Sequence, residues 1–464
     1  MSRLVIVSNR VATDPEKAAA GGLAVALTAA LEESHGLWFG WSGTLEENAS
    51  ESPHITERDG ITYATVDLDP ADFDEYYNGY ANQTLWPSFH YRADLASASY
   101  PFFEGYLRVN ALFARQLASL LKPDDIVWVH DYHLIPLAAE LRRLGVSAPL
   151  GFFLHTPFPV PQILTTLFNH DTLIRTLLAY DLVGFQTPDD LRAFEDYVVD
   201  VLGGTVSEDH RATADGQTVQ GGVFPIGIDP DAYAALAVSD EAQWHRARVR
   251  QSLANGILVI GVDRLDYSKG LPERMKAIEC LLQHHSEYCG DLTYVQIAAP
   301  SRTDVPEYVE IRQELEVTCG RINGRFSTYD WVPIRYVNQP YSQAVLAGLY
   351  RAAQVGLVTP LRDGMNLVAK EYVATQDPAD PGVLILSQFA GAAYELATAL
   401  IVNPHDTQEV GESLDRALRM PLEERRERWS AMMETLRRNN INQWRERFLA
   451  ALRAARVSAE RRAL

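Results

Sequence analysis

Two basic residues and two carboxylates, in two separate segments, have the types and spacing for chemistry on a phosphorylated sugar. Arg264 and Lys269 follow one apolar run, in a chain that contains only five lysines. A planar guanidinium fork and a compact ammonium can together neutralise a diphosphate. Asp363 and Glu371 follow another apolar run, where a carboxylate can accept hydrogen bonds from sugar hydroxyls. The four residues therefore predict a site for a sugar bonded to a diphosphate.

The segment that carries Asp363 has the form of a strand, a turn and a helix. Residues 352–358 are apolar and end before a proline, which predicts a buried parallel strand. Apolar residues then recur at helical spacing, so we expect a helix to begin near Asn366. The first N–H groups of such a helix can bind an anion. By its form alone, this segment is more typical of an ordinary strand–helix turn than of an anion site. Arg264 and Lys269 could likewise form surface ion pairs instead of binding a diphosphate.

The N-terminal half repeats the pattern of an apolar strand followed by polar residues. The polar residues that follow successive predicted strands are Arg10, Asp131, His155 and Gln186. Polar strand ends of this kind mark the ligand crevice of an open α/β sheet. Gly22 precedes a helix predicted over 24–31 and forms a second candidate anion site. The loop-like aromatic segment 74–87, with Tyr77 and Trp86, could pack beneath neighbouring loops or bind a ligand.

The predicted fold class is α/β, with two doubly wound, Rossmann-like domains. A fresh series of apolar strands begins near residue 257, which indicates two domains in tandem rather than one large sheet. We expect an N-terminal domain over 1–235, a C-terminal domain over 236–445 and a final helix over 446–464. An apolar stripe that includes Trp444 and Phe448 predicts that this helix packs back on the N-terminal domain.

Composition argues against several classes of protein. The 464 residues, 47% of them hydrophobic, suffice for two or three domains. A formal charge of −20 argues against nucleic acid or an anionic membrane as a partner. No apolar run approaches the roughly 20 residues of a membrane span, and the N-terminus does not resemble a signal peptide. Three cysteines, an odd number, fit a reducing cytoplasm, so a cytoplasmic protein is predicted.

Neither a metal centre nor a covalent nucleophile is predicted. His130, Asp131 and His133 could suggest a metal site, but no further ligand cluster accompanies them. No nucleophile with a paired base carries a recognisable signature. We therefore expect no metal and no cofactor, and a site that stabilises a departing diphosphate.

A series of motifs closely resembles the retaining trehalose-6-phosphate synthases. They run from residue 2 to about residue 448 and include VSNR, AGGLAVAL, GLWFGWSG, DEYYN, LWPSFHYR, WVHDYHL, FFLHTPFP, VDRLDYSKGLPER, TPLRDGMNLVAKEYVA and SQFAGAA. The resemblance implies the GT-B glycosyltransferase fold, with two domains facing a central cleft. It also implies transfer of glucose from a nucleoside-diphosphate glucose to glucose 6-phosphate, in trehalose biosynthesis and osmoprotection. The implied mechanism is metal-free, and the leaving diphosphate takes the acceptor proton as the new bond forms.

The resemblance also assigns roles around the donor. Arg264 and Lys269 would hold the diphosphate, and Asp363 would bind hydroxyls of the donor glucose. His155 would lie at the 6-hydroxyl of that sugar, and Glu371 would bind the ribose. The positions expected to supply backbone N–H groups are Gly22, Gly364, Met365, Asn366, Leu367 and Val368.

On the acceptor side, the resemblance implies that a cationic and aromatic set surrounds the phosphate of glucose 6-phosphate while Asp131 binds the sugar. That set is Arg10, Tyr77, Trp86 and Arg302. The nearest rival is glucosylglycerol-phosphate synthase, which uses glycerol 3-phosphate, and Asp131 favours glucose 6-phosphate over it. A silent sugar-phosphate sensor and an NAD-linked oxidoreductase are less favoured, because the diphosphate residues are present and G-x-G-x-x-G is absent. The donor base (uracil, guanine or adenine) and the oligomeric state, dimer or tetramer, stay open.

Overall fold

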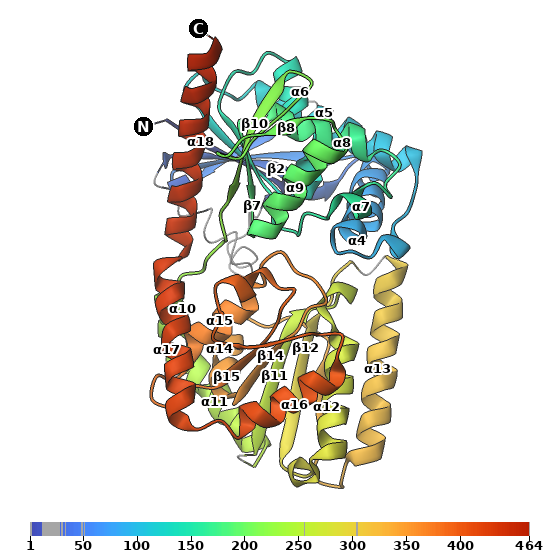
Figure 1. Cartoon of the computed structure of the whole chain (residues 1–464), viewed down its shortest axis with the longest axis vertical. Helices are drawn as coiled ribbons and strands as arrows, with labels where there is room; N and C mark the ends of the chain where they lie inside the picture. The colour runs from blue at the N-terminus through green and yellow to red at the C-terminus, as the bar shows by residue number, and fades with distance from the viewer. Residues whose placement is uncertain are drawn as a thin grey trace. The chain divides into compact units, whose positions relative to one another are not determined.

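The computed structural model describes residues 2–11, 28, 31–32, 34–47, 50, 52–254, 256–302 and 305–463 (Figure 1). The chain divides into two compact units. Unit 1 comprises Met1–Pro225 and Asn442–Leu464, and unit 2 comprises Ile226–Ile441. The sequence-based boundaries at residues 235 and 445 lie ten and four residues beyond these limits.

Unit 1 is built on a ten-stranded sheet in the order β3-β4-β2-β1-β5-β6-β7-β10-β9-β8. The strands from β4 to β10 in this order pair in parallel, and the pairs β3–β4, β9–β10 and β8–β9 are antiparallel. The strand bounds are β1 Leu4–Arg10, β2 Leu37–Leu45, β3 His54–Arg58, β4 Ile61–Leu68, β5 Ile126–His130, β6 Leu150–Phe153, β7 Leu182–Phe185, β8 Thr205–Val206, β9 Arg211–Ala214 and β10 Gln217–Val223. Arg10 is thus the last residue of a strand, whereas the sequence places it in a loop.

The helices of unit 1 include the aromatic segment, and here the prediction of a loop is wrong. Its residues form α3 (Pro70–Phe73), the π-helix η1 (Asp74–Leu85) and α4 (Trp86–Phe89). A π-helix has a wider turn than an α-helix, so its apolar residues do not recur at the α-helical period used to recognise helices. Between α4 and the C-terminal helix, the described part of unit 1 also contains the α-helices α5 Tyr100–Ala118, α6 Leu137–Arg143, α7 Pro161–Leu164, α8 His170–Arg175 and α9 Pro188–Asp200.

The C-terminal helix α18 (Ile441–Ala463) packs on the sheet of unit 1, as its apolar stripe predicts. The Phe448 ring stacks on Trp128 of β5 with centroids 4.5 Å apart. Gly151 and Gly184, on β6 and β7, leave room for that ring, because a Cβ atom at either position would come within 3.0 Å of it. The fit between glycines and one aromatic ring therefore positions the helix.

Unit 2 is built on a six-stranded parallel sheet in the order β13-β12-β11-β14-β15-β16. The series of strands predicted to begin near residue 257 is present, and it includes the strand predicted over 352–358. The strand bounds are β11 Ile257–Arg264, β12 Leu292–Ala299, β13 Ile334–Val337, β14 Val355–Val358, β15 Val383–Ser387 and β16 Leu400–Val402. The two strands that sequence reasoning missed, β13 and β16, are short edge strands. The α-helices are α10 Pro230–Leu236, α11 Asp240–Ser252, α12 Leu271–His284, α13 Pro306–Phe326, α14 Gln343–Ala352, α15 Leu367–Thr375, α16 Thr407–Leu418 and α17 Leu422–Arg438.

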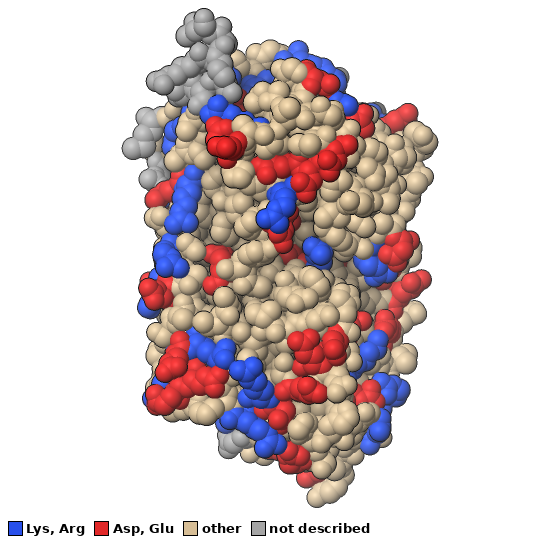
Figure 2. Space-filling model, viewed as in Figure 1, with Lys and Arg blue, Asp and Glu red and all other residues tan. Residues whose placement is uncertain are grey.

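The surface carries charges of both signs. On the face drawn in Figure 2, acidic and basic side chains of the described residues are interspersed. Among the helices that the structure describes, none is both long and apolar enough to cross a membrane.

Candidate active site

Two loops of unit 2 meet at a glycine and bring the predicted diphosphate residues together. The loop after β11 contains the short 3-10 helix Tyr267–Lys269, which ends at Gly270. Gly270 has a φ of 65°, and a Cβ atom there would lie 2.5 Å from the carbonyl oxygen of Thr359, just after β14. A larger residue would be strained by its backbone and would push the loops apart. Gly270 therefore allows the two strand ends to share one site.

The contact between these loops is an ion pair. Lys269 Nζ donates to Asp363 Oδ2 at 2.5 Å, and Asn366 Nδ2 donates to the same oxygen at 3.0 Å. Both charged side chains are mostly buried, with 9% and 13% of their surface exposed. Asp363 is also held by its backbone, because its N–H donates to the Phe389 carbonyl oxygen at 3.1 Å. The structure thus brings together Lys269 and Asp363, which the sequence assigns to diphosphate and sugar.

Arg274 is a residue of this site that sequence reasoning missed. Its fully buried guanidinium pairs with Asp263 at 2.5 Å and donates to the carbonyl oxygen of Lys269 and to Thr359 Oγ1, each at 3.0 Å. These bonds tie β11, the Lys269 turn and the end of β14 to one side chain. A helical arginine ordinarily lies at the surface, so only its place in the VDRLDYSKGLPER motif could have marked it.

Helix α15 begins at the turn that carries Asp363. Its N-cap is Asn366, whose side chain accepts a hydrogen bond from the N–H of Ala369 at 3.4 Å. Asn366 has a φ of 75°, and the neighbouring Met365 carbonyl accepts from the N–H of Ala392 at 2.8 Å. Leu367 and Val368 form the first turn, and N–H groups there have no acceptor within a helix. The geometry fits the predicted anion cradle from Gly364 to Val368, whose role stays a prediction.

Glu371, one turn into α15, lies against Tyr233 of α10. The Tyr233 hydroxyl donates to Glu371 Oε1 at 3.0 Å. Burial raises the pKa of Glu371 to about 7, although hydrogen bonding by Tyr233 acts to lower it. The residue as a whole is half-buried. The predicted role at the donor ribose is compatible with this position.

Arg264 and Arg302 flank the same loop in unit 2. Arg264 is the exposed last residue of β11. Arg302 Nη1 donates to the Tyr308 hydroxyl at 2.5 Å and lies 3.7 Å from Asp266 Oδ2. Asp266 stands between Arg264 and Lys269 in the sequence. Arg302 also has a φ of 48°, which is uncommon for a residue other than glycine. Within unit 2, the residue predicted for the acceptor phosphate is therefore anchored beside the donor loop.

In unit 1, the end of β5 carries Asp131 in a strained conformation. Its φ of 76° and ψ of 165° lie in a region that is populated almost only by glycine. The strain is held in place by hydrogen bonds, because the Asp131 N–H donates to the Phe153 carbonyl oxygen and Oδ1 accepts from the His155 N–H at 3.2 Å. Strain of this kind gathers at functional sites, and Asp131 is the residue assigned to the acceptor sugar.

His155 is neutral near pH 7. Its Nε2 lies 3.1 Å from Nδ1 of the buried His130. Burial lowers the pKa of His155 to about 3 and that of His130 well below its usual value, which the charge of His155 would lower further. A neutral imidazole can form a hydrogen bond with a sugar hydroxyl and does not repel a nearby cation. This agrees with the predicted position of His155 at the 6-hydroxyl.

A chain of aromatic contacts links the predicted acceptor residues of unit 1. The Arg10 guanidinium lies 5.5 Å from the Trp41 ring, and Trp41 lies 6.0 Å from Tyr77. Successive ring contacts then run from Tyr77 to His133 at 5.8 Å, from His133 to Tyr132 at 4.0 Å and from Tyr132 to Trp86 at 5.7 Å. Asp131 precedes two of these rings in sequence. These contacts connect Arg10, Tyr77 and Trp86 through neighbouring rings, and Asp131 adjoins Tyr132 in the chain.

With both sets of residues in place, comparison with known proteins assigns the chain to a family. The sequence profile of glycosyltransferase family 20 matches residues 3–454. The chain belongs to glycosyltransferase family 20. It is a glycosyltransferase, and the predicted resemblance to the trehalose-6-phosphate synthases is confirmed.

Relatives within family 20 match the chain over nearly its whole length. A trehalose-6-phosphate synthase of Cronobacter sakazakii is 50% identical over 454 residues, which cover 98% of this chain and 95% of the relative. The solved structure of a UDP-forming α,α-trehalose-phosphate synthase from Burkholderia xenovorans in complex with glucose 6-phosphate has a TM-score of 0.94 and 51% identity, and covers 97% and 100% of the two chains. The Escherichia coli protein bound with UDP-2-fluoro glucose has a TM-score of 0.93 and 49% identity, and covers 97% and 99%. The predicted GT-B fold is confirmed by these matches.

One predicted donor residue of this family 20 chain, Gly22, lies outside the described residues, as does most of the helix predicted after it. Its assignment to the diphosphate stays a prediction.

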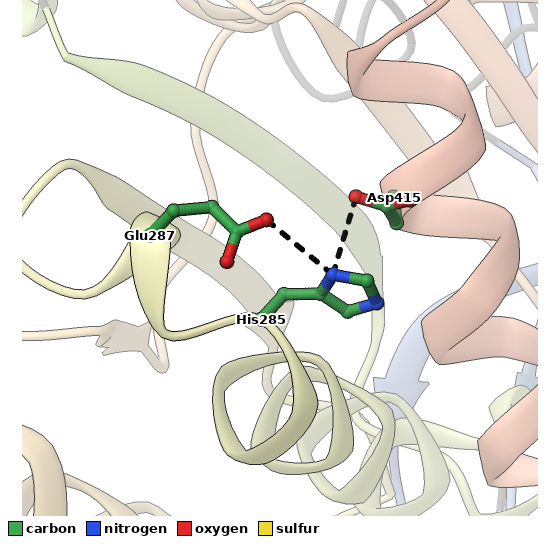
Figure 3. Close-up of side chains that lie close together, drawn as sticks. All are labelled: His285, Glu287 and Asp415. Carbon is green, nitrogen blue, oxygen red and sulfur yellow. Dashed lines mark ion pairs between the residues drawn. The ribbon is translucent and has the colours of Figure 1, made fainter.

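Within the described part of this family 20 chain, one group of three side chains could hold a metal ion: His285, Glu287 and Asp415 (Figure 3). His285 Nδ1 lies 3.5 Å from an oxygen of each carboxylate. Arg419 already pairs with both carboxylates, at 2.5 and 2.7 Å. The group lies beyond the C-terminus of α12, whereas Lys269 precedes its N-terminus, and a helix of this length spans about 20 Å. The group therefore offers no ligand to the Lys269 turn.

Proposed function

We propose that this chain transfers glucose from UDP-glucose to glucose 6-phosphate, with retention of configuration, and so makes α,α-trehalose 6-phosphate. The observation that carries the proposal is the Lys269–Asp363 pair at the start of α15. In it, a cation that suits a diphosphate lies beside a carboxylate that suits a sugar and beside a helix N-terminus that suits phosphate oxygens. Full-length likeness to trehalose-6-phosphate synthases supports the same activity.

The donor residues act on the charge that develops as the glucose leaves. When the bond between C1 and the β-phosphate oxygen breaks, negative charge grows on the diphosphate. Lys269, Arg264 and the N–H groups from Gly364 to Val368 then stabilise that charge more strongly than in the ground state. Asp363 holds the sugar hydroxyls, and Lys269 can move from Asp363 toward the diphosphate. Glu371 accepts hydrogen bonds from the ribose.

The acceptor residues bring the 1-hydroxyl of glucose 6-phosphate to the face that the diphosphate leaves. A new bond forms between that oxygen and C1 of the donor glucose, and the hydroxyl proton passes to the departing diphosphate oxygen. Configuration at C1 is retained because attack and departure occur on the same face. Arg10 and Arg302 neutralise the acceptor phosphate, with Tyr77 and Trp86 as hydrogen-bond donors, and Asp131 accepts from the sugar hydroxyls.

Uracil is the donor base that the relatives support, since solved neighbours are described as UDP-forming and as bound with UDP-2-fluoro glucose. The sequence alone does not distinguish among uracil, guanine and adenine as the donor base. We also propose that the protein is cytoplasmic and forms a homo-oligomer, either a dimer or a tetramer. Light scattering on the purified protein would test the oligomeric state.

The identity of the product tests the proposal. Purified protein is incubated with UDP-, GDP- or ADP-glucose and with either glucose 6-phosphate or glycerol 3-phosphate, and the products are examined by NMR. We expect α,α-trehalose 6-phosphate and UDP as the favoured products. A glucosylglycerol phosphate would support the rival acceptor, and no transfer with any pair would support a sugar-phosphate sensor.

A further inference from the structure

A polar pocket of unit 2 lies at the edge of the sheet opposite to the Asp363 turn. Its lining residues 352–354 directly precede β14, and residues 376–382 precede β15, whereas the Asp363 turn follows β14. The pocket has a volume of about 180 Å³, well above the roughly 10–15 Å³ that one water needs. It is therefore large enough for a polyatomic ion.

Four arginines from three helical segments line this pocket: Arg246 and Arg250 of α11, Arg351 of α14 and Arg425 of α17. Two carboxylates also line it. Asp377 lies 3.2 Å from Arg351, and Asp380 lies 2.7 Å from Arg425. The lining therefore carries two more positive than negative charges, in a chain whose formal charge is −20.

Like charges face each other within the pocket. Arg246 and Arg250 are four residues apart on α11, so both lie on one face of the helix, and a like-charged pair at that spacing destabilises a helix. Arg351 is mostly buried, and its Nη1 donates to the carbonyl oxygens of Thr375 and Gln376, each at 3.0 Å. Burial lowers the pKa of Arg351, and the charge of Arg246 lowers it further against the opposing effect of Asp377. An anion between these guanidinium groups would relieve the repulsion.

We propose that this four-arginine pocket binds a phosphate group, either as the free ion or as part of a small phosphate monoester. Guanidinium groups bind phosphate through paired N–H donors, and a dianion matches the excess of two positive charges. The site is separate from the donor residues, which lie at the carboxyl ends of the strands. Its closest link to them is α15, since Thr375 ends the helix that carries Glu371.

Calorimetric titration tests the proposal with two probes, inorganic phosphate and glycerol 2-phosphate. The whole protein is first saturated with UDP, so that the diphosphate site of the transfer reaction is occupied. Glucose 6-phosphate is left out, because it is itself a phosphate monoester and would compete for the four-arginine pocket. We expect wild-type protein to bind at least one probe with a dissociation constant of about 1 mM or lower. The comparison of probes shows whether the free ion or the monoester is the better ligand.

Matched arginine variants locate the binding. Arg246→Gln combined with Arg250→Gln should weaken probe binding by about tenfold or more, because two charge-assisted donors are lost. The control is Arg248→Gln, on the same helix, since Arg248 stacks on Trp244 at 5.0 Å and does not line the pocket. Hydrogen exchange of residues 376–382 should slow with the probe in wild type and control but not in the double variant. Absence of binding by wild type, or equal binding by the double variant, would overturn the proposal.

Discussion

The Lys269 ammonium and the Asp363 carboxylate form a buried ion pair at 2.5 Å, although the two residues are 94 positions apart in sequence. Asn366, the N-cap of α15, donates to the same carboxylate oxygen. The pair therefore joins the loop after β11 to the start of α15. A diphosphate bound there would compete with Asp363 for Lys269. We therefore expect donor binding to break the ion pair, with Lys269 then contacting the phosphate and Asp363 the sugar.

Replacement of Lys269 or Arg264 by alanine should separate catalysis from stability. Each variant should lose several kcal/mol of transition-state stabilisation, measured as kcat/KM, because charge builds on the leaving diphosphate. Lys269→Ala should also lower the free energy of unfolding by about 1–3 kcal/mol, because it leaves the buried Asp363 with one partner fewer. Arg264→Ala should leave stability nearly unchanged, since Arg264 is exposed. The sequence alone predicts little effect on folding for either variant, and the buried pair corrects that expectation for Lys269.

A near-normal kcat/KM in both single variants would contradict the assignment of these residues to the diphosphate. Equal loss of stability in both would contradict the account of the buried pair. Urea unfolding of the wild type and the two variants under one buffer condition supplies the comparison.

Glu371 should make stability depend on pH. Its pKa is raised to about 7 in the folded protein, so the folded state favours the protonated form. The favourable contribution of that form is complete below the unfolded pKa and is lost as the pH rises through about 7. Glu371→Gln should therefore stabilise the protein more at about pH 8 than at about pH 5, by about 1–2 kcal/mol. Denaturant unfolding at the two pH values measures the difference, and a gain that is equal at both would show that Glu371 ionises normally.

The strained backbone of Asp131 should lower the stability of the protein, whereas its carboxylate should be needed for activity. Glycine adopts its backbone conformation without strain, whereas alanine does not, so Asp131→Gly should be more stable than Asp131→Ala by about 1–3 kcal/mol. Both variants lack the carboxylate and should transfer glucose poorly. Thermal unfolding and kcat/KM for the two variants check this. If the alanine variant were the more stable, the strain at Asp131 would not be intrinsic to its backbone.

The sequence predicts the framework well because strands and helices leave periodic patterns. The apolar run before Thr359 and the helical spacing after Asn366 place Asp363 and Glu371 correctly within unit 2. Side-chain environment is harder to predict. Lys370 and Arg274 are charged helix residues, which ordinarily lie at the surface, yet both are fully buried, and Lys370 pairs with Glu395 at 2.5 Å.

Backbone strain is also invisible to pattern reasoning. Asp131 and Arg302 have positive φ values that only the folded structure reveals. The segment Asp74–Leu85 forms a π-helix where the sequence predicts a loop, because no α-helical period runs through its aromatic residues. Features that depend on contacts between distant segments thus escape a local pattern.

Removal of divalent metal should leave activity intact. The residues assigned to the diphosphate are cations and helix N–H groups, which need no bridging ion. Among the described residues, one group could hold a metal ion: His285, Glu287 and Asp415. Its two carboxylates already pair with Arg419, and the group lies beyond the far end of α12 from Lys269. Activity should survive dialysis against excess chelator, with His285→Ala as a matched control that behaves like wild type. Complete loss that magnesium or manganese restores would refute the metal-free mechanism.

The most direct test of the proposed reaction is the kcat/KM of wild-type protein and of Asp131→Ala for glucose 6-phosphate and glycerol 3-phosphate, with UDP-glucose as donor. Wild type should strongly prefer glucose 6-phosphate, by a factor that can reach about 10⁴, because a shorter acceptor lacks the sugar hydroxyls that would donate to the Asp131 carboxylate. Asp131→Ala should lose most of that preference and much of its rate. Arg302→Ala serves as the control, since loss of a phosphate contact should weaken both acceptors alike. A wild type that prefers glycerol 3-phosphate would contradict the synthesis of trehalose 6-phosphate by this chain.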